Sequence, residues 1–298
     1  MAKHAVKISI LLVWLTIMGW WWLESRSWPP PAKIEVAFLP DFNDYFSLKY
    51  GDQKIGWAFK SLRRLPGGAG YQVGQGLVVR LALAGEELEI KSTLMANLDK
   101  SLNLLDFTHL VQAGPLTVSE IGVVADERLS VEVNLGEHGP VVAKIAAAYG
   151  GLGGQYAEKL DFSRPAILPA PAGPALAQAL PPYLSYLGLE AGRHYALKQL
   201  NPLSRQLDEF PVRVEEEGRE YDQEAGRKIP AFRIRLTSAG GDSLIWVDRF
   251  GRTFREEAAG FTLTRLYEQS EAGQGITPLA PAPGFEQLLS LGRKPKHD

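Results

Sequence analysis

Few residues in this chain are of types that carry chemistry, and they are widely spaced. The chain contains no cysteine, which excludes disulfide bonds, thiolate metal sites and a cysteine nucleophile. No two of the five histidines are close in sequence, and none forms a His-Glu-x-x-His pair; they are His4, His109, His138, His194 and His297. We therefore expect neither a metal site nor a cofactor. His109, in a strand-like run with Phe107 and Leu110, is predicted to be a packed or surface residue of a strand and not a catalyst.

Carboxylates cluster at Glu215, Glu216 and Glu217, and again at Asp222 and Glu224. A hydrolase would need two acidic side chains facing one pocket, with the pKa of at least one raised by an apolar environment. Consecutive acidic residues at a turn more often form a solvated hairpin tip, and no G-x-S-x-G nucleophile elbow is present. We therefore expect that the protein is not an enzyme, and a carboxylate-dependent hydrolase is the second alternative.

Aromatic residues are the candidates for a ligand site, and six of them are considered: Trp57, Tyr71, Tyr183, Tyr186, Trp246 and Phe261. The four outside the helical stretch described below lie in strand-like runs, where they could line an apolar cavity or simply fill the core. The two remaining tyrosines lie beside leucines in that helical stretch. This stretch could be a lid over the concave face of a curved sheet, or a helix that covers the core.

The elements that position these residues begin with an apolar segment, residues 8–23, which has no charged residue and no proline. With Ala5 and Val6 added, a helix rising about 1.5 Å per residue covers most of a roughly 30 Å hydrocarbon core. Lys3 and Lys7 precede the segment, so the amino terminus should be cytoplasmic and the rest of the chain outside. Tryptophans favour the membrane interface, and the anchor residues are Trp14, Trp20, Trp21 and Trp22.

No Ala-x-Ala site follows the apolar segment, so we expect an uncleaved signal anchor in preference to a cleaved signal peptide. The sequence therefore predicts a single-pass protein of a bacterial inner membrane, with the lipid bilayer as a partner and the bulk of the chain in the periplasm. The net charge is −2 and no long basic run occurs, so we expect no nucleic-acid partner.

Hydropathy and turn residues divide the chain into six segments. They are a cytoplasmic start and transmembrane anchor (1–27), a Pro-rich linker (28–43), a first antiparallel strand run (44–138), a Gly/Pro-rich crossing with a helical insert (139–192), a second antiparallel strand run (193–268) and a C-terminal tail (269–298). About seven strands are expected in the first run, because apolar and polar residues alternate between short turns. Within the insert, residues 174–189 are predicted to be helical, with Pro181 and Pro182 kinking or splitting the helix. The tail is expected to be loosely attached, with a short helix at 285–291.

The predicted fold is mainly β: a large curved antiparallel sheet, either an open half barrel or two packed sheets, with a helical insert. The pattern leaves open whether the two strand runs form one sheet or two domains.

Several short motifs resemble a bacterial extracytoplasmic β-rich region that is found ahead of transglutaminase-like cysteine peptidase domains. Tyr45-Phe46-Ser47-Leu48-Lys49-Tyr50-Gly51 with Lys54-Ile55-Gly56-Trp57 resembles its opening. Gly188-Leu189-Glu190-Ala191-Gly192-Arg193-His194-Tyr195 with Asn201-Pro202 resembles its middle, and Ile245-Trp246-Val247-Asp248 with Gly251-Arg252 and Arg255-Glu256-Glu257 its closing hairpin. The order of sheet, helical insert and sheet is also similar to lipoprotein-carrier (LolA-like) half barrels. Because this chain lacks cysteine, the resemblance implies an envelope module without the peptidase.

Together these features favour a membrane-anchored, extracytoplasmic and non-enzymatic protein. Its curved sheet is expected to bind an apolar ligand such as a lipid, or an envelope partner protein. The alternative is a structural subunit of a membrane-bound envelope complex.

Overall fold

The structure is a computed structural model of the 298-residue chain. It describes residues 39–279 except for 84–85, 115, 137–163, 172, 174–175, 177–179, 202–205, 223–225 and 239–240. The predicted anchor, most of the linker, the glycine-rich crossing and the helix expected at 285–291 lie outside the described residues. Within the described part of the chain, no helix has both the length and the apolar character needed to cross a bilayer.

The first strand run is an antiparallel meander of seven strands, as the alternation predicted. The strands are β1 (Phe42–Tyr50), β2 (Gln53–Arg64), β3 (Gly70–Leu83), β4 (Glu86–Asp99), β5 (Leu104–Ala113), β6 (Leu116–Ala125) and β7 (Arg128–Asn134), with a short 3-10 turn at Pro66–Gly68. Each pairs with its neighbour in sequence, because the short turns leave little chain for a crossing.

Among the described residues, the second run follows a short strand and an α-helix. The elements are β8 (Ala166–Pro169), α3 (Leu180–Leu187), β9 (His194–Asn201), β10 (Gln206–Asp222), β11 (Arg227–Ser238), β12 (Gly241–Val247), β13 (Thr253–Ala258) and β14 (Phe261–Leu266), then a 3-10 turn at Gln269–Glu271. The alternation of apolar and polar residues predicts six strands in this run, at 194–200, 206–217, 229–238, 243–248, 253–257 and 261–267, and β9 to β14 match them to within five residues at each end.

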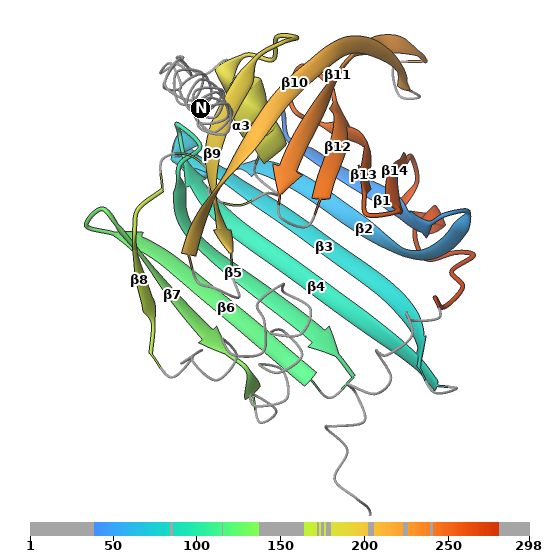
Figure 1. The fold of residues 1–298 in the computed structure, drawn as a ribbon, viewed down its shortest axis with the longest axis horizontal. Helices are drawn as coiled ribbons and strands as arrows, with labels where there is room; N and C mark the ends of the chain where they lie inside the picture. Colours follow the sequence, from blue (N-terminus) through green and yellow to red (C-terminus); the bar gives the residue numbers. More distant parts are fainter. Residues whose placement is uncertain are drawn as a thin grey trace, which may run out of the picture.

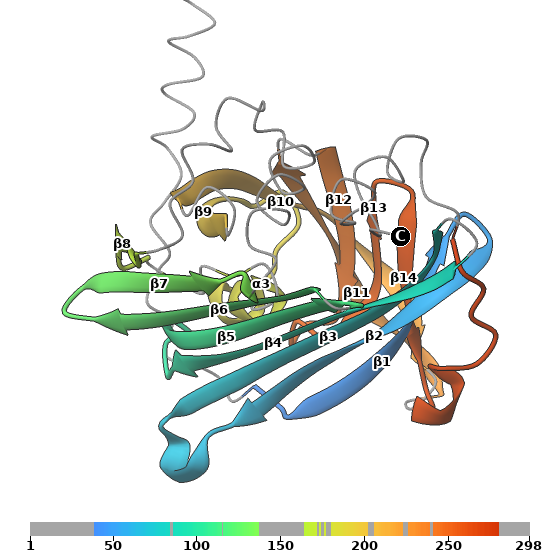
Figure 2. The same cartoon turned by 90° about the horizontal axis from the view of Figure 1, so that it is seen from below.

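The fourteen strands in the described part of the chain belong to one antiparallel sheet, in the order β8-β7-β6-β5-β4-β3-β2-β1-β14-β13-β12-β11-β10-β9. The two runs join where β1 pairs with β14, from Tyr45 opposite Leu266 to Tyr50 opposite Phe261. The sheet curls, so that β9 and β10 lie across from β3 to β6 with α3 between them (Figures 1 and 2). The open half barrel is therefore the observed form, and the alternative of two packed sheets is wrong.

Helix α3 begins where the sequence predicted a break. Pro181 and Pro182 lie in its first turn, where backbone N–H groups have no partner within the helix, so proline costs little there. In the described residues the two prolines thus start a helix; they do not kink one. Ser185 of α3 also donates a hydrogen bond to the carbonyl of Arg249, which ties the helix to the turn between β12 and β13.

The inner face of the sheet is the face that packs on α3. One row of side chains crosses seven strands in register on this face, and it consists of Phe42, Leu62, Val73, Ala96, Phe107, Gly122 and Val131. Most of this row is buried in one apolar core together with Leu180, Tyr183 and Leu184 of α3. The helix therefore closes one end of the inner face.

The described part of the tail is attached to the sheet. Leu279 forms a parallel bridge with Leu81 of β3, and the N–H of Thr277 donates to the carbonyl of Lys54. The prediction of a loosely attached tail is therefore wrong as far as Leu279.

Candidate functional site

A belt of polar residues crosses the inner face next to the apolar row. The register places these residues side by side on neighbouring strands, and they are Asp44, Lys60, Gln75, His109 and Glu120, with Leu94 between Gln75 and His109. We call these five residues the polar belt. Polar groups on the inside of a curved sheet lose hydration, so they need partners within the protein.

At one end, the polar belt forms ion pairs with the second strand run. The carboxylate of Asp44, which is 4% exposed, accepts hydrogen bonds from Nε and Nη2 of Arg252 at 2.6 to 3.0 Å. Nζ of Lys60 lies 2.5 Å from Oε2 of Glu256 on β13 and also lies over the ring of Phe46. These contacts join β1 and β2 to β13 and the turn before it.

At the other end, His109 lies between two partners from adjacent strands. Nε2 of His109 is 2.9 Å from Oγ of Ser92 on β4, and Nδ1 is 3.1 Å from Oε2 of Glu120 on β6. In the neutral imidazole tautomer that carries its proton on Nδ1, Nδ1 donates to the Glu120 carboxylate and Nε2 accepts from the serine hydroxyl. The result is a directed chain of hydrogen bonds from Ser92 to His109 to Glu120.

On the side of the polar belt away from α3, the inner face becomes aliphatic. Two further rows in register place half-buried side chains there, and we call them the aliphatic strip: Leu77, Val79, Ile90, Val111 and Val118. Ser92 lies within this strip, opposite Leu77 on β3 and Val111 on β5. The inner face therefore changes from filled core, through the polar belt, to an aliphatic surface.

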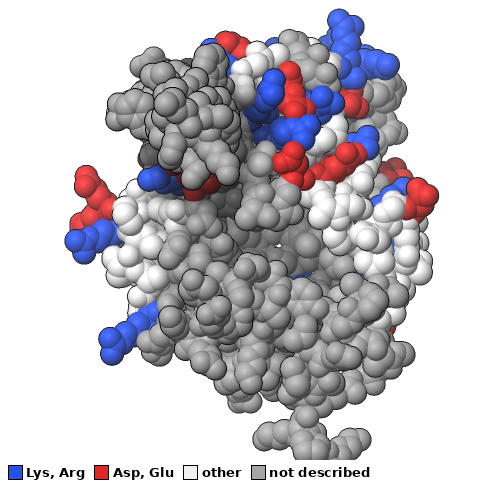
Figure 3. All heavy atoms as spheres, in the orientation of Figure 1, with Lys and Arg blue, Asp and Glu red and all other residues white. Residues whose placement is uncertain are grey.

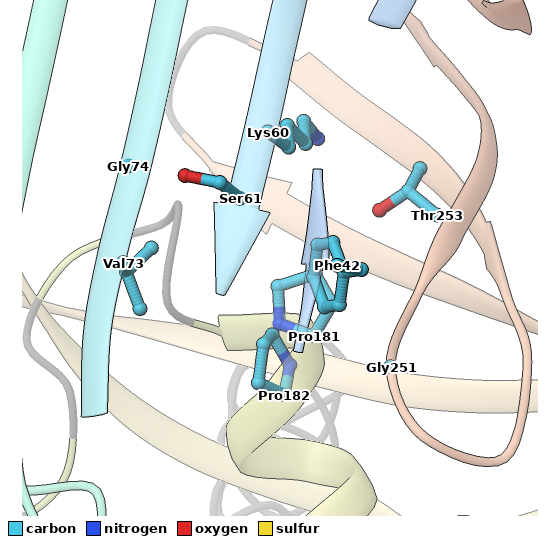
Figure 4. Close-up of a pocket in the computed structure, with 9 residues that line it drawn as sticks. All are labelled: Phe42, Lys60, Ser61, Val73, Gly74, Pro181, Pro182, Gly251 and Thr253. Atoms are coloured by element: carbon cyan, nitrogen blue, oxygen red, sulfur yellow. The ribbon is translucent and has the colours of Figure 1, made fainter. Parts of the chain in front are cut away.

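The space beside α3 is too small for a ligand. It is enclosed by Phe42, Lys60 and Val73 from the sheet, Pro181 and Pro182 from α3, and Gly251 and Thr253 from the β12–β13 turn, with Ser61 and Gly74 at its edge (Figure 4). Its volume is about 10 Å³, far below the several hundred cubic ångströms of a typical ligand pocket. A side-chain carbon on Gly251 would lie 2.3 Å from the carbonyl oxygen of Pro181, so the turn and α3 are in close contact.

The predicted aromatic site is divided among separate places. Tyr71 and Tyr183 are buried in the core cluster, where Tyr183 belongs to a core-covering helix. Trp57 lies on the outer face against Tyr45, with ring centroids 6.4 Å apart. Trp246 is also on the outer face, under the guanidinium of Arg255.

Phe261 is exposed at the end of β14, where its ring contacts Tyr50, and the side chain of Tyr186 lies outside the description. The structure thus brings only Tyr71 and Tyr183 of the six into one described cluster. The anchor residues Trp14, Trp20, Trp21 and Trp22 precede the described range.

The carboxylates singled out in the sequence do not form a described acid–base pair. Glu215 bonds to Arg235 at 2.5 Å and to Arg233 at 2.8 Å, and the hydrogen bond from Arg235 holds the pKa of Glu215 below its usual value. Arg235 also pairs with Asp242, and Figure 3 shows basic and acidic side chains interleaved where Figure 1 places β10 to β12. The side chains of Glu216, Glu217, Asp222 and Glu224 are outside the description.

Two further features of the described residues have the burial or the volume of a site. Asp248 is a buried carboxyl whose pKa is raised by desolvation, but it accepts backbone N–H groups from Phe250 and Arg252 and so builds the β12–β13 turn. A cleft of about 340 Å³ is lined by Lys49, Gly51, Glu220, Phe254, Arg255, Thr262, Thr264, Arg265 and Tyr267. Its charges are partly matched within the protein, since Glu220 lines the same cleft and Arg255 pairs with Glu257.

Comparison with known proteins supports the fold. No family model matches the chain, and no curated protein matches it. A solved structure that resembles it is a β-barrel-like protein of the domain of unknown function DUF1849 from Brucella abortus. The TM-score is 0.50 at 10% identity, over 77% of this chain and 96% of the other. At this identity the likeness shows a β-barrel-like fold alone, and the association with transglutaminase-like peptidases stays a prediction.

Sequence reasoning missed Ser92 and Glu120 and described His109 as an ordinary strand residue. Alternation alone places each of the three on a face of its own strand. It does not give the register that places the three side chains side by side. No short motif links them either, because Ser92 and Glu120 lie 17 and 11 positions from His109.

Proposed function

We propose that this protein is a membrane-anchored, extracytoplasmic binding protein whose inner sheet face holds an amphipathic, lipid-like ligand. The observation that carries the proposal is the boundary between the polar belt and the aliphatic strip. A ligand with an aliphatic chain would lie on the strip and direct its polar end to the belt. Apolar contact supplies the binding free energy in such sites, and a few polar groups fix the orientation.

The aliphatic strip sets the scale of the binding free energy for a ligand of lipid size. Burying one aliphatic side chain is worth about 1.5–3 kcal/mol, and the aliphatic strip offers several half-buried ones. Micromolar binding corresponds to about 8 kcal/mol net of the cost of immobilising the ligand, so the ligand would have to contact most of the strip and not two or three of its side chains. The membrane anchor, predicted from residues 8–23, would hold the site close to a source of such molecules.

The test is native mass spectrometry of the full chain, released gently from detergent. We expect a co-purifying mass in the range of a lipid, and we expect Val111→Lys on the aliphatic strip to reduce its retention by at least about tenfold. Leu110→Lys is the matched control, because Leu110 is the next residue of β5, is also half-buried and lies on the outer face. Equal retention in both variants would contradict the proposed site.

A co-purifying polypeptide in place of a lipid-sized mass would instead support the structural subunit of an envelope complex. In that case replacement of Trp20, Trp21 and Trp22 should release the partner. A bare monomer would contradict both functions.

A further inference from the structure

The Ser92–His109–Glu120 chain has the atom order of a catalytic triad. In such triads the serine hydroxyl bonds to Nε2 of the histidine, and Nδ1 donates to a carboxylate that fixes the ring and stabilises the imidazolium. Here the two distances are 2.9 and 3.1 Å, and the three residues lie on the adjacent strands β4, β5 and β6. Glu120 is 8% exposed, so its carboxylate acts on His109 with little screening by water.

We infer that Ser92 is an activated nucleophile that cleaves carboxylic esters of aliphatic acyl chains. This inference rests on the proposed function, because the acyl chain would occupy the aliphatic strip. The substrate class follows from the neighbours of the serine, since Leu77 and Val111 lie opposite Ser92 on the two flanking strands. An acyl chain against these side chains would bring its carbonyl carbon next to Oγ.

The proton and the bonds can be followed through the reaction. Oγ of Ser92 bonds to the carbonyl carbon while its proton passes to Nε2 of His109. The carbon–oxygen bond of the ester then breaks, and the alcohol leaves with the proton from His109. In the second half, water bonds to the acyl carbon and gives a proton to His109. The bond between the acyl carbon and Oγ then breaks, His109 returns the proton to Oγ, and the carboxylic acid leaves.

The oxyanion would need a side-chain donor, because the backbone amides around Ser92 lie in paired strands. Gln75 is the residue that the register places for this role. Gln75 on β3 pairs with Leu94 on β4, and Ser92 lies two residues from Leu94 on the same face of β4. Gln75 is therefore a diagonal neighbour of Ser92. Diagonal neighbours have Cα atoms about 7–8 Å apart, within reach of a glutamine amide and a bound carbonyl between them.

The first test is covalent labelling of the full chain with a long-chain alkyl fluorophosphonate, followed by intact-mass measurement and peptide mapping. The expected result is a single adduct on Ser92, formed by a new bond from Oγ to phosphorus with release of fluoride. Ser92→Ala should abolish the adduct, and Thr93→Ala, which changes an exposed outer-face residue, should leave it unchanged. A wild-type protein that takes no label overturns the inference, and so does an adduct that persists in Ser92→Ala.

The second test separates catalysis from folding. His109→Gln should slow labelling about 10²- to 10⁴-fold, the usual contribution of a general base, while its far-UV circular dichroism spectrum stays that of the folded wild type. Glu120 is a positioning residue, so Glu120→Gln should slow labelling with unchanged thermal stability, and Glu120→Asp should restore part of the rate. Variants that lose labelling only in proportion to lost folded protein would contradict these roles.

Substrate preference completes the test. Hydrolysis of p-nitrophenyl octanoate should exceed that of the acetate, and Gln75→Ala should lower kcat with little change in KM. A lipid-sized ligand retained by a protein without serine labelling would overturn the inference and leave the proposed function intact. Labelling and ester hydrolysis without a retained ligand would support the inference and contradict the proposed function.

Discussion

The ion pair between Asp44 and Arg252 joins the two strand runs near the middle of the sheet, and its loss should be costly. Asp44 lies on β1, and Arg252 lies in the turn between β12 and β13, 208 positions away. Three nitrogen–oxygen contacts of 2.6 to 3.0 Å connect them, and the side chains of Asp44 and Arg252 are 4% and 21% exposed. Replacing Arg252 and replacing Asp44 should therefore cost different amounts of stability, because the partner left behind is more buried in the first case than in the second.

Arg252→Ala leaves the buried carboxylate without this cation. Removing one partner of a buried ion pair costs about 3–5 kcal/mol in the free energy of unfolding. Asp44→Ala leaves a guanidinium that keeps part of its hydration, so we expect the smaller cost of lost charged hydrogen bonds, about 1.5–3 kcal/mol. The double variant should cost less than the sum by about 1–3 kcal/mol, because both changes remove the same contacts.

Urea and thermal denaturation of the full chain, followed by circular dichroism in one detergent, measure these differences. For a domain of 150–250 residues each kcal/mol moves Tm by about 2–4 °C, so Arg252→Ala should lower Tm by roughly 10 °C. Lys91→Ala is the control, since Lys91 pairs with Glu89 at 2.8 Å with its own side chain 55% exposed, and it should stay within about 0.5 kcal/mol. Our reasoning is refuted if Arg252→Ala costs no more than Lys91→Ala, or if the two single costs simply add.

Two further predictions concern packing and pH. Gly122→Ala should destabilise the fold by about 1–3 kcal/mol in urea denaturation, because the new carbon would lie 2.0 Å from Cε1 of Phe107; an unchanged midpoint would contradict the packing. Burial raises the pKa of Asp248 in the folded protein above its unfolded value of about 3.9. The wild type therefore loses stability as pH rises from the unfolded value through the folded pKa, and Asp248→Asn should gain stability relative to the wild type over that range. The hydrogen bond from Arg235 lowers the pKa of Glu215, which stabilises the fold above an unfolded value of about 4.3; Glu215→Gln should therefore lose relative stability as pH rises. Denaturation between pH 3 and 7 tests both signs, and parallel pH profiles for the two variants would contradict them.

The sequence by itself determined the local elements. Alternation of apolar and polar residues depends on neighbours in the chain, so the strands are found almost where they were predicted, as β11 shows at Arg227–Ser238 against a prediction of 229–238. The position of Pro181 and Pro182 in the first turn of α3 is also a local feature. A proline pair breaks a helix or starts one according to where the first turn lies, and here that turn is placed by contact with Gly251.

Only the tertiary structure decided which strands are partners and in what register. The period of two assigns Ser92, His109 and Glu120 to faces of their own strands, but a shift of one residue in pairing would send a side chain to the opposite face. The register of β4 and β5 shifts at Asn97 and Leu98, where a bulge changes the count, and no pattern along one strand announces it. The pairing of β1 with β14 likewise joins segments from opposite ends of the described chain, and no pattern within either strand announces it. Strand composition is local information, whereas the candidate site arises from pairing between segments that the sequence keeps apart.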